Sequence, residues 1–204
     1  MYISLSFDDG PNTQTTPLVL DILEQEHVAA SFFLIGQNIT EETIPVIERE
    51  QSLGCDIECH SWTHLDMTKM TEDAIQDEIT RTCSVIEKIT GSSPAFFRPP
   101  YISVNDALYD AVHLPFICGM GVEDWVPEVP AAERAARVID GVKDGTIVLL
   151  HDFSGNVNTV EALKTIIPSL REKGYTFVTV PQLFNLSGVN PDQPHKIWTH
   201  VTEA

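Results

Sequence analysis

With 204 residues, the chain has the size of a single domain folded around one hydrophobic core. It carries 12 basic against 30 acidic residues, and a net charge of −18 disfavours nucleic acid and anionic membrane surfaces as partners. No apolar run approaches the roughly 18 residues of a membrane span, and Met1 leads directly into a strand pattern, so no signal peptide is expected.

Strand and helix patterns alternate along most of the chain. The strand patterns, short and rich in apolar residues, are Tyr2–Phe7, Ser31–Ile35, Cys55–Cys59, Ala95–Arg98, Phe116–Gly119, Thr146–His151 and Thr176–Val180. The helical patterns are Thr16–Glu26, Glu41–Ser52, Glu72–Thr90, Asn105–Val112, Ala131–Val142 and Thr159–Lys173. This alternation predicts an α/β fold, with a parallel sheet covered by helices.

Polar residues at the ends of the predicted strands favour a closed barrel over an open sheet. These residues are Asp8 and Asp9, His60, Arg98, Asp124 and His151. A barrel collects the C-terminal ends of its strands at one face, whereas a doubly wound sheet concentrates chemistry at one switch point. We therefore predict a distorted (β/α) barrel with about seven strands.

The most informative pattern is the Asp8–Asp9 pair, where the first strand meets the turn at Gly10 and Pro11. Strand alternation turns Asp8 into the barrel mouth, and the turn lets Asp9 join it. His60 and His64 follow the third strand, and a helical turn there would place both imidazoles on one side. Asp9, His60 and His64 are candidate ligands of a divalent metal ion that keeps open positions for water and substrate, with Asp8 beside them as a base.

Alternation places further side chains near this mouth. Glu58 lies two residues before His60 on the same face, where it could orient a ligand imidazole or act only as a solvated polar residue. Leu149 and His151 share the inner face of the sixth strand.

The four cysteines do not predict a disulfide framework. Cys55 and Cys59 lie about 13 Å apart along one strand, at ~3.3 Å per residue, which is too far for a bridge. Cys83 and Cys118 are expected to be small buried apolar residues. We therefore expect four free thiols.

Residues 1–185 are predicted to form one domain, and residues 186–204 a linker or tail, either a linker remnant or a segment that wraps over the surface. The last segment contains Gly188, Pro191 and Pro194, and it has neither a strand nor a helix pattern. Trp198 within it is expected to pack incidentally.

Five motifs occur here in the order in which they occur in the polysaccharide deacetylases. They are Ser6–Pro11, His60–His64, Arg98–Tyr101, Asp124–Trp125 and Leu149–Asp152. Over residues 1–185 the chain resembles this family, carbohydrate esterase family 4 with its chitooligosaccharide-deacetylase homology domain, and it looks most like the acetyl xylan esterase members. The resemblance implies a distorted (β/α) barrel.

The resemblance also implies roles for individual residues. Asp8 would be the general base, held by Arg98. His151 would be the general acid that protonates the leaving group, oriented by Asp124. A carboxylate beside an imidazole raises its pKa, as a general acid requires.

The remaining implied residues hold the metal ion and the acetyl group. Asp9, His60 and His64 would bind one divalent ion, with zinc or cobalt the first expectation and nickel or iron also compatible with these ligands. Trp125 and Leu149 would line the pocket for the acetyl methyl group. The backbone N–H of Tyr101 would help to stabilise the oxyanion.

The implied substrate is an acetylated polysaccharide, with O-acetyl esters of xylan the first expectation. N-deacetylation of chitin oligomers or peptidoglycan is the alternative within the family. Ile102 and Gly121 stand where the family often has Gly and Asp, which alters loops at the mouth rather than catalytic groups. The resemblance also implies an extracellular, secreted protein, with other modules of a larger enzyme as partners. The sequence alone would also suit a cytoplasmic chain.

Two readings from other classes agree less well with the residues. A non-catalytic carbohydrate-binding barrel predicts the loss of Asp8 or His151, and both are present. A metal phosphoesterase would need more carboxylate ligands or a second metal, and basic residues around the phosphate, whereas one arginine is expected at this site.

Overall fold

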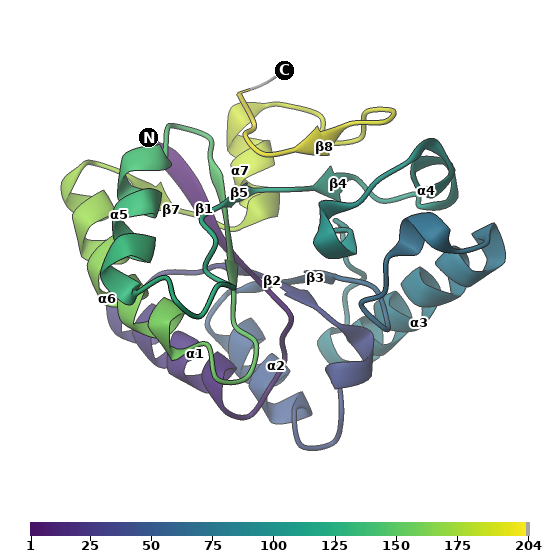
Figure 1. Cartoon of the computed structure of the whole chain (residues 1–204), viewed down its shortest axis with the longest axis horizontal. Helices are drawn as coiled ribbons and strands as arrows, with labels where there is room; N and C mark the ends of the chain where they lie inside the picture. Colours follow the sequence, from purple (N-terminus) through teal and green to yellow (C-terminus); the bar gives the residue numbers. More distant parts are fainter. Residues whose placement is uncertain (203–204) are drawn as a thin grey trace.

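A computed structural model describes residues 1–202 and places the strands at the centre, with helices packed around them (Figure 1). The strands are β1 (Tyr2–Asp8), β2 (Ser31–Leu34), β3 (Asp56–Cys59), β4 (Phe116–Ile117), β5 (Met120–Gly121), β6 (Ile147–His151), β7 (Thr176–Phe177) and β8 (Ile197–Trp198). The α-helices are α1 (Thr15–Glu26), α2 (Ile44–Ser52), α3 (Glu72–Thr90), α4 (Asp106–Ala111), α5 (Ala131–Gly141), α6 (Val157–Glu172) and α7 (Val180–Ser187). Short 3₁₀ turns occupy Gly36–Asn38, Met67–Lys69 and Pro100–Ile102.

Parallel pairing organises the sheet around β1. The order β3-β2-β1-β6-β5 forms one sheet, with β7 paired to the beginning of β1, and β4 pairs with β8 in a second sheet. Single bridges at Phe97 join β3 to β4, and a bridge between Thr146 and His200 joins the β6 side to the β8 side. The strands therefore close into an irregular ring, and the predicted distorted barrel is confirmed.

The predicted elements occur in the predicted order, and three of the predicted strands differ from the structure. Helix α7 and strand β8 were not predicted, and α2 begins at Ile44 instead of Glu41. Residues Ala95–Arg98 contribute a single bridge at Phe97 instead of a strand. The strand expected over Phe116–Gly119 is divided, because Gly119 adopts a left-handed φ of 89° between β4 and β5. Thr176–Val180 is a strand only over its first two residues, since Val180 begins α7.

Alternation along β1 sorts its side chains as the sequence predicted. Ile3, Leu5 and Phe7 are fully buried in the main apolar cluster, together with residues of α1 and α6. Ser6 and Asp8 point the other way, toward Arg98. The helix-facing side of the strand therefore supplies the core, and the inner side supplies polar groups.

The segment expected to be a linker or tail packs onto the barrel as far as residue 202. β8 lies beside β4 (Figure 1). Trp198 is fully buried, its ring contacts Phe184 at 5.3 Å, and its indole N–H donates to the carbonyl of Pro191. Trp198 is thus a core residue, not an incidental contact, because it belongs to a buried apolar cluster that includes Ile117 of β4 and Ile147 of β6. Residues 203 and 204 of the expected tail lie outside the described residues.

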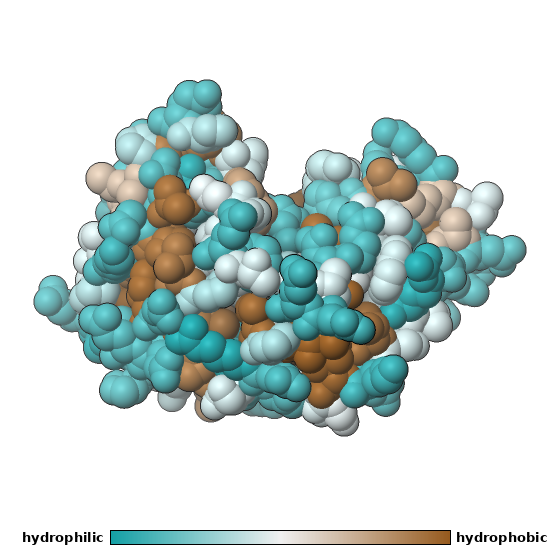
Figure 2. Space-filling view, turned by 90° about the horizontal axis from the view of Figure 1, so that it is seen from below, coloured by the Kyte–Doolittle hydropathy of each residue, from teal (hydrophilic) through white to brown (hydrophobic). Residues whose placement is uncertain are grey.

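The surface is polar over most of the face seen from below. Figure 2 shows hydrophilic side chains there, interrupted by separate hydrophobic areas, and an outline that is hollowed between two raised parts. No helix in residues 1–202 is both long and apolar enough to cross a membrane. All four cysteines are free thiols, as expected.

Candidate active site

The turn after β1 is held by hydrogen bonds at three successive carbonyls. The carbonyl of Asp8 accepts from the N–H of Asp152, and that of Gly10 accepts from the N–H of Ile35. The carbonyl of Asp9 accepts from Nδ2 of Asn38 at 3.0 Å. Asp9 has a left-handed φ of 77°, so the strand ends there and both carboxylates reach the same side.

The loop after β3 carries His60 and His64, and it is not helical. Its backbone is left-handed at Ser61 (φ 65°) and at His64 (φ 58°), so the predicted helical turn is wrong. The loop instead folds back on itself, and the two imidazole rings lie 4.9 Å apart.

Glu78 on α3 holds this histidine loop in place. Its carboxylate accepts hydrogen bonds from the backbone N–H groups of Trp62 and Thr63 at 2.8 and 2.7 Å, and from the Thr63 hydroxyl at 2.9 Å. From the other side, the N–H of Gly36 donates to the carbonyl of Ser61. The sequence gives no sign of this role, because Glu78 stands in an ordinary amphipathic helix pattern.

Asp9, His60 and His64 present ligand atoms to a common point. Oδ1 of Asp9 lies 3.6 Å from Nε2 of His60 and 3.4 Å from Nε2 of His64. Ligand atoms of the three residues all lie within 4.8 Å of one another, so the group could hold a metal ion. Oδ1 of Asp9 is buried without a hydrogen-bond partner among the described residues, which fits an atom reserved for a cation.

The protonation states of this group also favour metal binding. Burial raises the pKa of Asp9, but the nearby His60, with the charges of His151 and His64, lowers it below its ordinary value. Burial and the charge of His60 lower the pKa of His64 against the opposing charges of Asp9 and Asp8. A carboxylate beside a neutral imidazole is the form that a divalent ion requires.

Glu58 does not orient His60. Its Oε2 accepts from the backbone N–H groups of Ala95 and Phe96 at 2.7 and 2.8 Å. Nδ1 of His60 instead contacts the carbonyl oxygen of Arg98 at 2.7 Å, which leaves Nε2 turned toward Asp9. Neither of the two alternatives for Glu58 holds. The side chain is fully buried, so it is not a solvated residue, and its carboxylate binds the backbone that follows α3 instead of His60.

Arg98 and Asp8 form a buried pair at the floor of the site. Nη1 of Arg98 lies 2.5 Å from Oδ1 of Asp8, and its Nη2 donates to the hydroxyl of Ser6 at 2.8 Å. Both side chains are almost completely buried, and the guanidinium stacks over the ring of Phe33. The pair fixes one oxygen of Asp8 and turns the other toward the histidine side, where Oδ2 lies 3.7 Å from Nε2 of His60.

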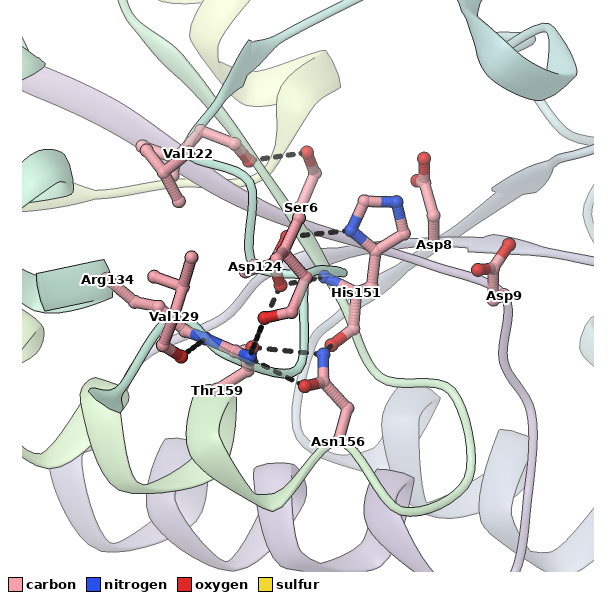
Figure 3. A network of polar contacts seen from close by, with 12 residues as sticks. Ser6, Asp8, Asp9, Val122, Asp124, Val129, Arg134, His151, Asn156 and Thr159 are labelled. Atoms are coloured by element: carbon pink, nitrogen blue, oxygen red, sulfur yellow. Dashed lines mark hydrogen bonds and ion pairs between the residues drawn. The ribbon is translucent and has the colours of Figure 1, made fainter.

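On the opposite side, Asp124 holds His151 at two points (Figure 3). Oδ1 of Asp124 lies 2.8 Å from Nδ1 of His151, and Oδ2 accepts from the backbone N–H of the same residue at 2.7 Å. Burial lowers the pKa of His151, but the hydrogen bond and charge of Asp124, with the charges of Asp8 and Asp9, raise it to about 9. The imidazolium form therefore predominates at neutral pH.

A buried arginine extends this network away from the cavity (Figure 3). Nη1 of Arg134 donates to Oδ1 of Asn156 at 2.6 Å and to the hydroxyl of Thr159 at 2.9 Å. Thr159 in turn donates to Asp124 at 2.8 Å, and Asn156 donates to the carbonyl of His151. Sequence reasoning missed these three residues, since an arginine and a threonine on helices carry no pattern that marks them as buried.

The two sides meet in a cavity of about 550 Å³. Besides Asp8, Asp9, His60, His64 and His151, its walls are Pro99, Tyr101, Ile102, Cys118, Gly119, Gly121, Trp125 and Leu149. All ten predicted site residues thus lie at this cavity or contact a residue that does. Trp125 packs edge-on against His151, and Tyr101 packs edge-on against His64, so an exposed aromatic side chain flanks each side.

Comparisons with known proteins agree with this arrangement. Residues 1–114 match the family Polysaccharide deacetylase. A bifunctional xylanase/deacetylase of Pseudobutyrivibrio xylanivorans is 50% identical over 199 residues, which cover 98% of this chain and 33% of that protein. A peptidoglycan-N-acetylglucosamine deacetylase, PgdA of Listeria monocytogenes, is 35% identical over 183 residues, covering 89% of this chain and 38% of that protein.

Two solved structures share the whole architecture. The Xyl-CE4 domain of a multidomain xylanase from the hindgut metagenome of Trinervitermes trinervoides has a TM-score of 0.98 and 45% identity, covering 100% of this chain and 98% of that one. A family 4 acetyl xylan esterase from Clostridium thermocellum, in complex with a cobalt ion, has a TM-score of 0.95 and 42% identity, with coverage of 98% and 99%.

The chain belongs to the polysaccharide deacetylase family, carbohydrate esterase family 4, which is a family of enzymes. It spans about a third of the length of the curated relatives described above.

Proposed function

We propose that this domain is a metal-dependent carbohydrate deacetylase that removes O-acetyl groups from xylan. One observation carries the proposal. Asp8, whose carboxylate is held by Arg98, and His151, whose imidazolium is held by Asp124, face the same cavity. A group of residues able to hold a cation lies beside them. The similarity to xylanase-linked deacetylases and to an acetyl xylan esterase supports the choice of substrate.

Asp9, His60 and His64 would hold the divalent ion. Oδ1 of Asp9 has no hydrogen-bond partner within residues 1–202, which supports this assignment. The ion, when bound, would polarise the acetyl carbonyl and lower the pKa of a water molecule. Two imidazoles and a carboxylate suit zinc or cobalt first, and nickel or iron also.

Proton transfer would be the task of the two fixed side chains. Asp8 would accept the proton of the attacking water as general base, and the guanidinium of Arg98 would keep it anionic and correctly oriented. His151 would donate a proton to the departing sugar oxygen as general acid. Asp124 supports this role, because it favours the imidazolium form and fixes Nδ1, which leaves Nε2 to face the substrate.

The walls of the cavity suit a small acyl group. Leu149 stands two residues before His151 on β6, and with Trp125 it would enclose the acetyl methyl group. Tyr101 has a left-handed φ of 58° in the turn after Pro100, and its backbone N–H would help to stabilise the oxyanion.

N-deacetylation of an amino sugar is the second candidate, favoured by the similarity to the peptidoglycan deacetylase. The same base and acid would serve an amide, which needs stronger protonation of its leaving group than an ester. A non-catalytic carbohydrate-binding barrel is disfavoured, because Asp8 and His151 both retain their fixing partners.

The cellular setting follows from the same relatives. We propose that the domain works outside the cell as one module of a larger xylan-degrading enzyme, since relatives include bifunctional and multidomain xylanases. The net charge of −18 is compatible with a neutral polysaccharide partner, and it disfavours nucleic acid and anionic membranes.

The test is acetate release from acetylated xylan and from N-acetylglucosamine oligomers by protein reconstituted with zinc or cobalt. A chelated sample and the Asp8→Asn variant are the controls. Release from xylan that both controls lack is the expected result. Release from the amino sugar alone would select the second candidate, and no release from either substrate by metal-loaded protein would contradict the deacetylase proposal.

A further inference from the structure

Asp152, the residue after His151, lies at the junction of the two strands that carry the proposed base and acid. Its backbone N–H donates to the carbonyl of Asp8 at 3.1 Å. Its own carbonyl accepts from Nδ2 of Asn12 at 2.7 Å. The Oδ1 atom of Asn12 in turn accepts from backbone N–H groups at the beginning of α1, including that of Thr15 at 2.6 Å. Asp152 therefore ties the end of β6 to both ends of the turn that leads from β1 into α1.

The carboxyl group of Asp152 is fully buried beneath this turn. Its Oδ2 accepts a short hydrogen bond from the hydroxyl of Thr16, in the first turn of α1. The group also rests against Gly10, where a Cβ would lie only 2.8 Å from Oδ2 and 3.1 Å from Oδ1. Only glycine lets the turn approach the carboxyl group this closely.

We propose that Asp152 is a positioning residue of the deacetylase site, which sets the distance between the Asp8–Asp9 turn and His151 through its hydrogen bonds and its packing under Gly10. The inference rests on the proposed function. Asp152 does not line the cavity, so it acts through the turn and not on the substrate. Catalytic geometry is sensitive to such support, because a misplacement of about 1 Å can cost about 10²-fold in rate.

The role is geometric rather than one of charge. Oδ1 of Asp152 has no hydrogen-bond partner among the described residues, so one carboxylate oxygen is not used. Burial, together with the charges of Asp9 and Asp8, raises the pKa of Asp152 to about 7, although the Thr16 hydroxyl lowers it. An amide of the same shape can keep the Thr16 contact and fill the same space.

Three variants separate the contributions of the Thr16 hydrogen bond, the packing under Gly10 and the charge of Asp152. Asp152→Ala removes the contact with Thr16 and the packing under Gly10, whereas Asp152→Asn retains both. Thr16→Val removes the hydroxyl, which donates to Asp152 and also accepts from the N–H of Asn12. Asp140→Ala and Thr165→Val, at exposed positions of α5 and α6, are matched controls. For each variant we would measure kcat per bound metal, KM for acetylated xylan, and the affinity and visible absorption spectrum of bound Co²⁺.

We expect Asp152→Ala to lower kcat per bound metal by about 10²-fold, with KM within about twofold of the parent. Its Co²⁺ affinity should fall by about tenfold with a changed spectrum, as for other residues that support a metal ligand. Thr16→Val should show a smaller loss in the same direction. Asp152→Asn should stay within about threefold of the parent, since it keeps the geometry.

Two results would overturn the proposal. In the first, Asp152→Ala lowers only thermal stability, while kcat per bound metal and the Co²⁺ spectrum stay unchanged. In the second, Asp152→Asn loses as much activity as Asp152→Ala, which would assign the effect to charge. The Co²⁺ measurements do not depend on turnover, so they still test the positioning role if the parent protein releases no acetate.

Discussion

The two sides of the cavity are built in opposite ways. On the side of the proposed metal ligands, Asp9 and His64 stand on left-handed backbone. Oδ1 of Asp9 lies 3.4–3.6 Å from the two imidazole nitrogens, and it has no hydrogen-bond partner among the described residues. On the acid side, Asp124 and His151 are joined at two points, and Thr159 and Arg134 continue the network.

This difference indicates which side depends on a bound partner. Buried polar groups in proteins are normally hydrogen-bonded. Oδ1 of Asp9 finds no partner in the described part of the chain, so it needs a cation or a proton to satisfy it. On the opposite side, both oxygens of Asp124 and Nδ1 of His151 have hydrogen-bond partners within the protein. Changes on the first side should therefore act through metal occupancy, and changes on the second through protonation.

The largest expected effect is that of Asp8→Asn. Asp8 lies between the proposed metal ligands and His151. Removal of the base should lower kcat on the order of 10³-fold, because general base catalysis contributes about 10²–10⁴-fold. Metal content, measured by atomic absorption, should remain near one per chain, since Asp8 is not among the proposed ligands. Loss of the metal from this variant would mean that the roles of Asp8 and Asp9 are exchanged.

Asp124→Asn should weaken the support of the proposed general acid, His151, and leave metal affinity unchanged. The pKa of His151 is raised by Asp124, so the variant should have a lower pKa at this histidine. A general acid must be protonated, so kcat/KM should fall as the pH rises above the pKa of His151. In the parent this fall is expected near pH 9, and in the variant at a lower pH. At pH 8 we expect a loss of about 10²-fold. A pH–rate profile with an unmoved basic limb would contradict this assignment of the acid.

His64→Ala should break the metal side while leaving the Asp124–His151 pair intact. Loss of one of three protein ligands should weaken zinc binding by about 10²-fold, measured by calorimetric titration. His113→Ala, at an exposed position after α4, is the matched control and should bind zinc as the parent does. An unchanged affinity in His64→Ala would remove this residue from the ligand set.

The smallest expected effect is that of Glu50→Gln. This variant tests whether a buried carboxylate without a hydrogen-bond partner in the described residues affects metal binding, as Asp9 should, or only stability. Glu50 on α2 is fully buried, and neither of its oxygens has a hydrogen-bond partner among the described residues. Burial raises the pKa of Glu50 well above 4.5, with a further contribution from the charge of Asp152. The folded state therefore holds the proton of Glu50 more tightly than the unfolded state. The contribution of Glu50 to the free energy of unfolding is fully present below pH 4.5, and it is lost as the pH rises through the raised pKa.

Removing this acid should therefore stabilise the protein at pH 7 by about 1–3 kcal/mol, and the gain should vanish near pH 4. Thermal denaturation at the two pH values checks this, with Glu48→Gln on the exposed side of α2 as control. Metal content should not change. An equal gain at both pH values would contradict the assignment of the effect to ionisation of Glu50.

Residues that follow strand periodicity could be placed from the sequence. Alternation in β1 and β6 put Asp8, Leu149 and His151 on the inner side, and the structure has them there. Strand alternation and helix periodicity did not predict the site where the backbone is irregular or where a partner comes from a distant part of the chain. The left-handed residues Ser61 and His64 replaced an expected helical turn, and Glu58 paired with backbone N–H groups that no sequence pattern could bring to it.

The sequence by itself determined the α/β class, the order of the five motifs and the residue types of the site, because each depends on local periodicity or on short spacing. It also favoured a barrel, but the contacts that close the ring join residues far apart in the chain. Only the tertiary structure decided that residues 189–202 pack onto the ring through β8 and Trp198, that Arg134 and Thr159 extend the hydrogen bonds of Asp124, and that Asp152 lies under Gly10. These contacts join residues far apart in the chain, and their energies depend on burial and distance, which appear only when the chain is folded.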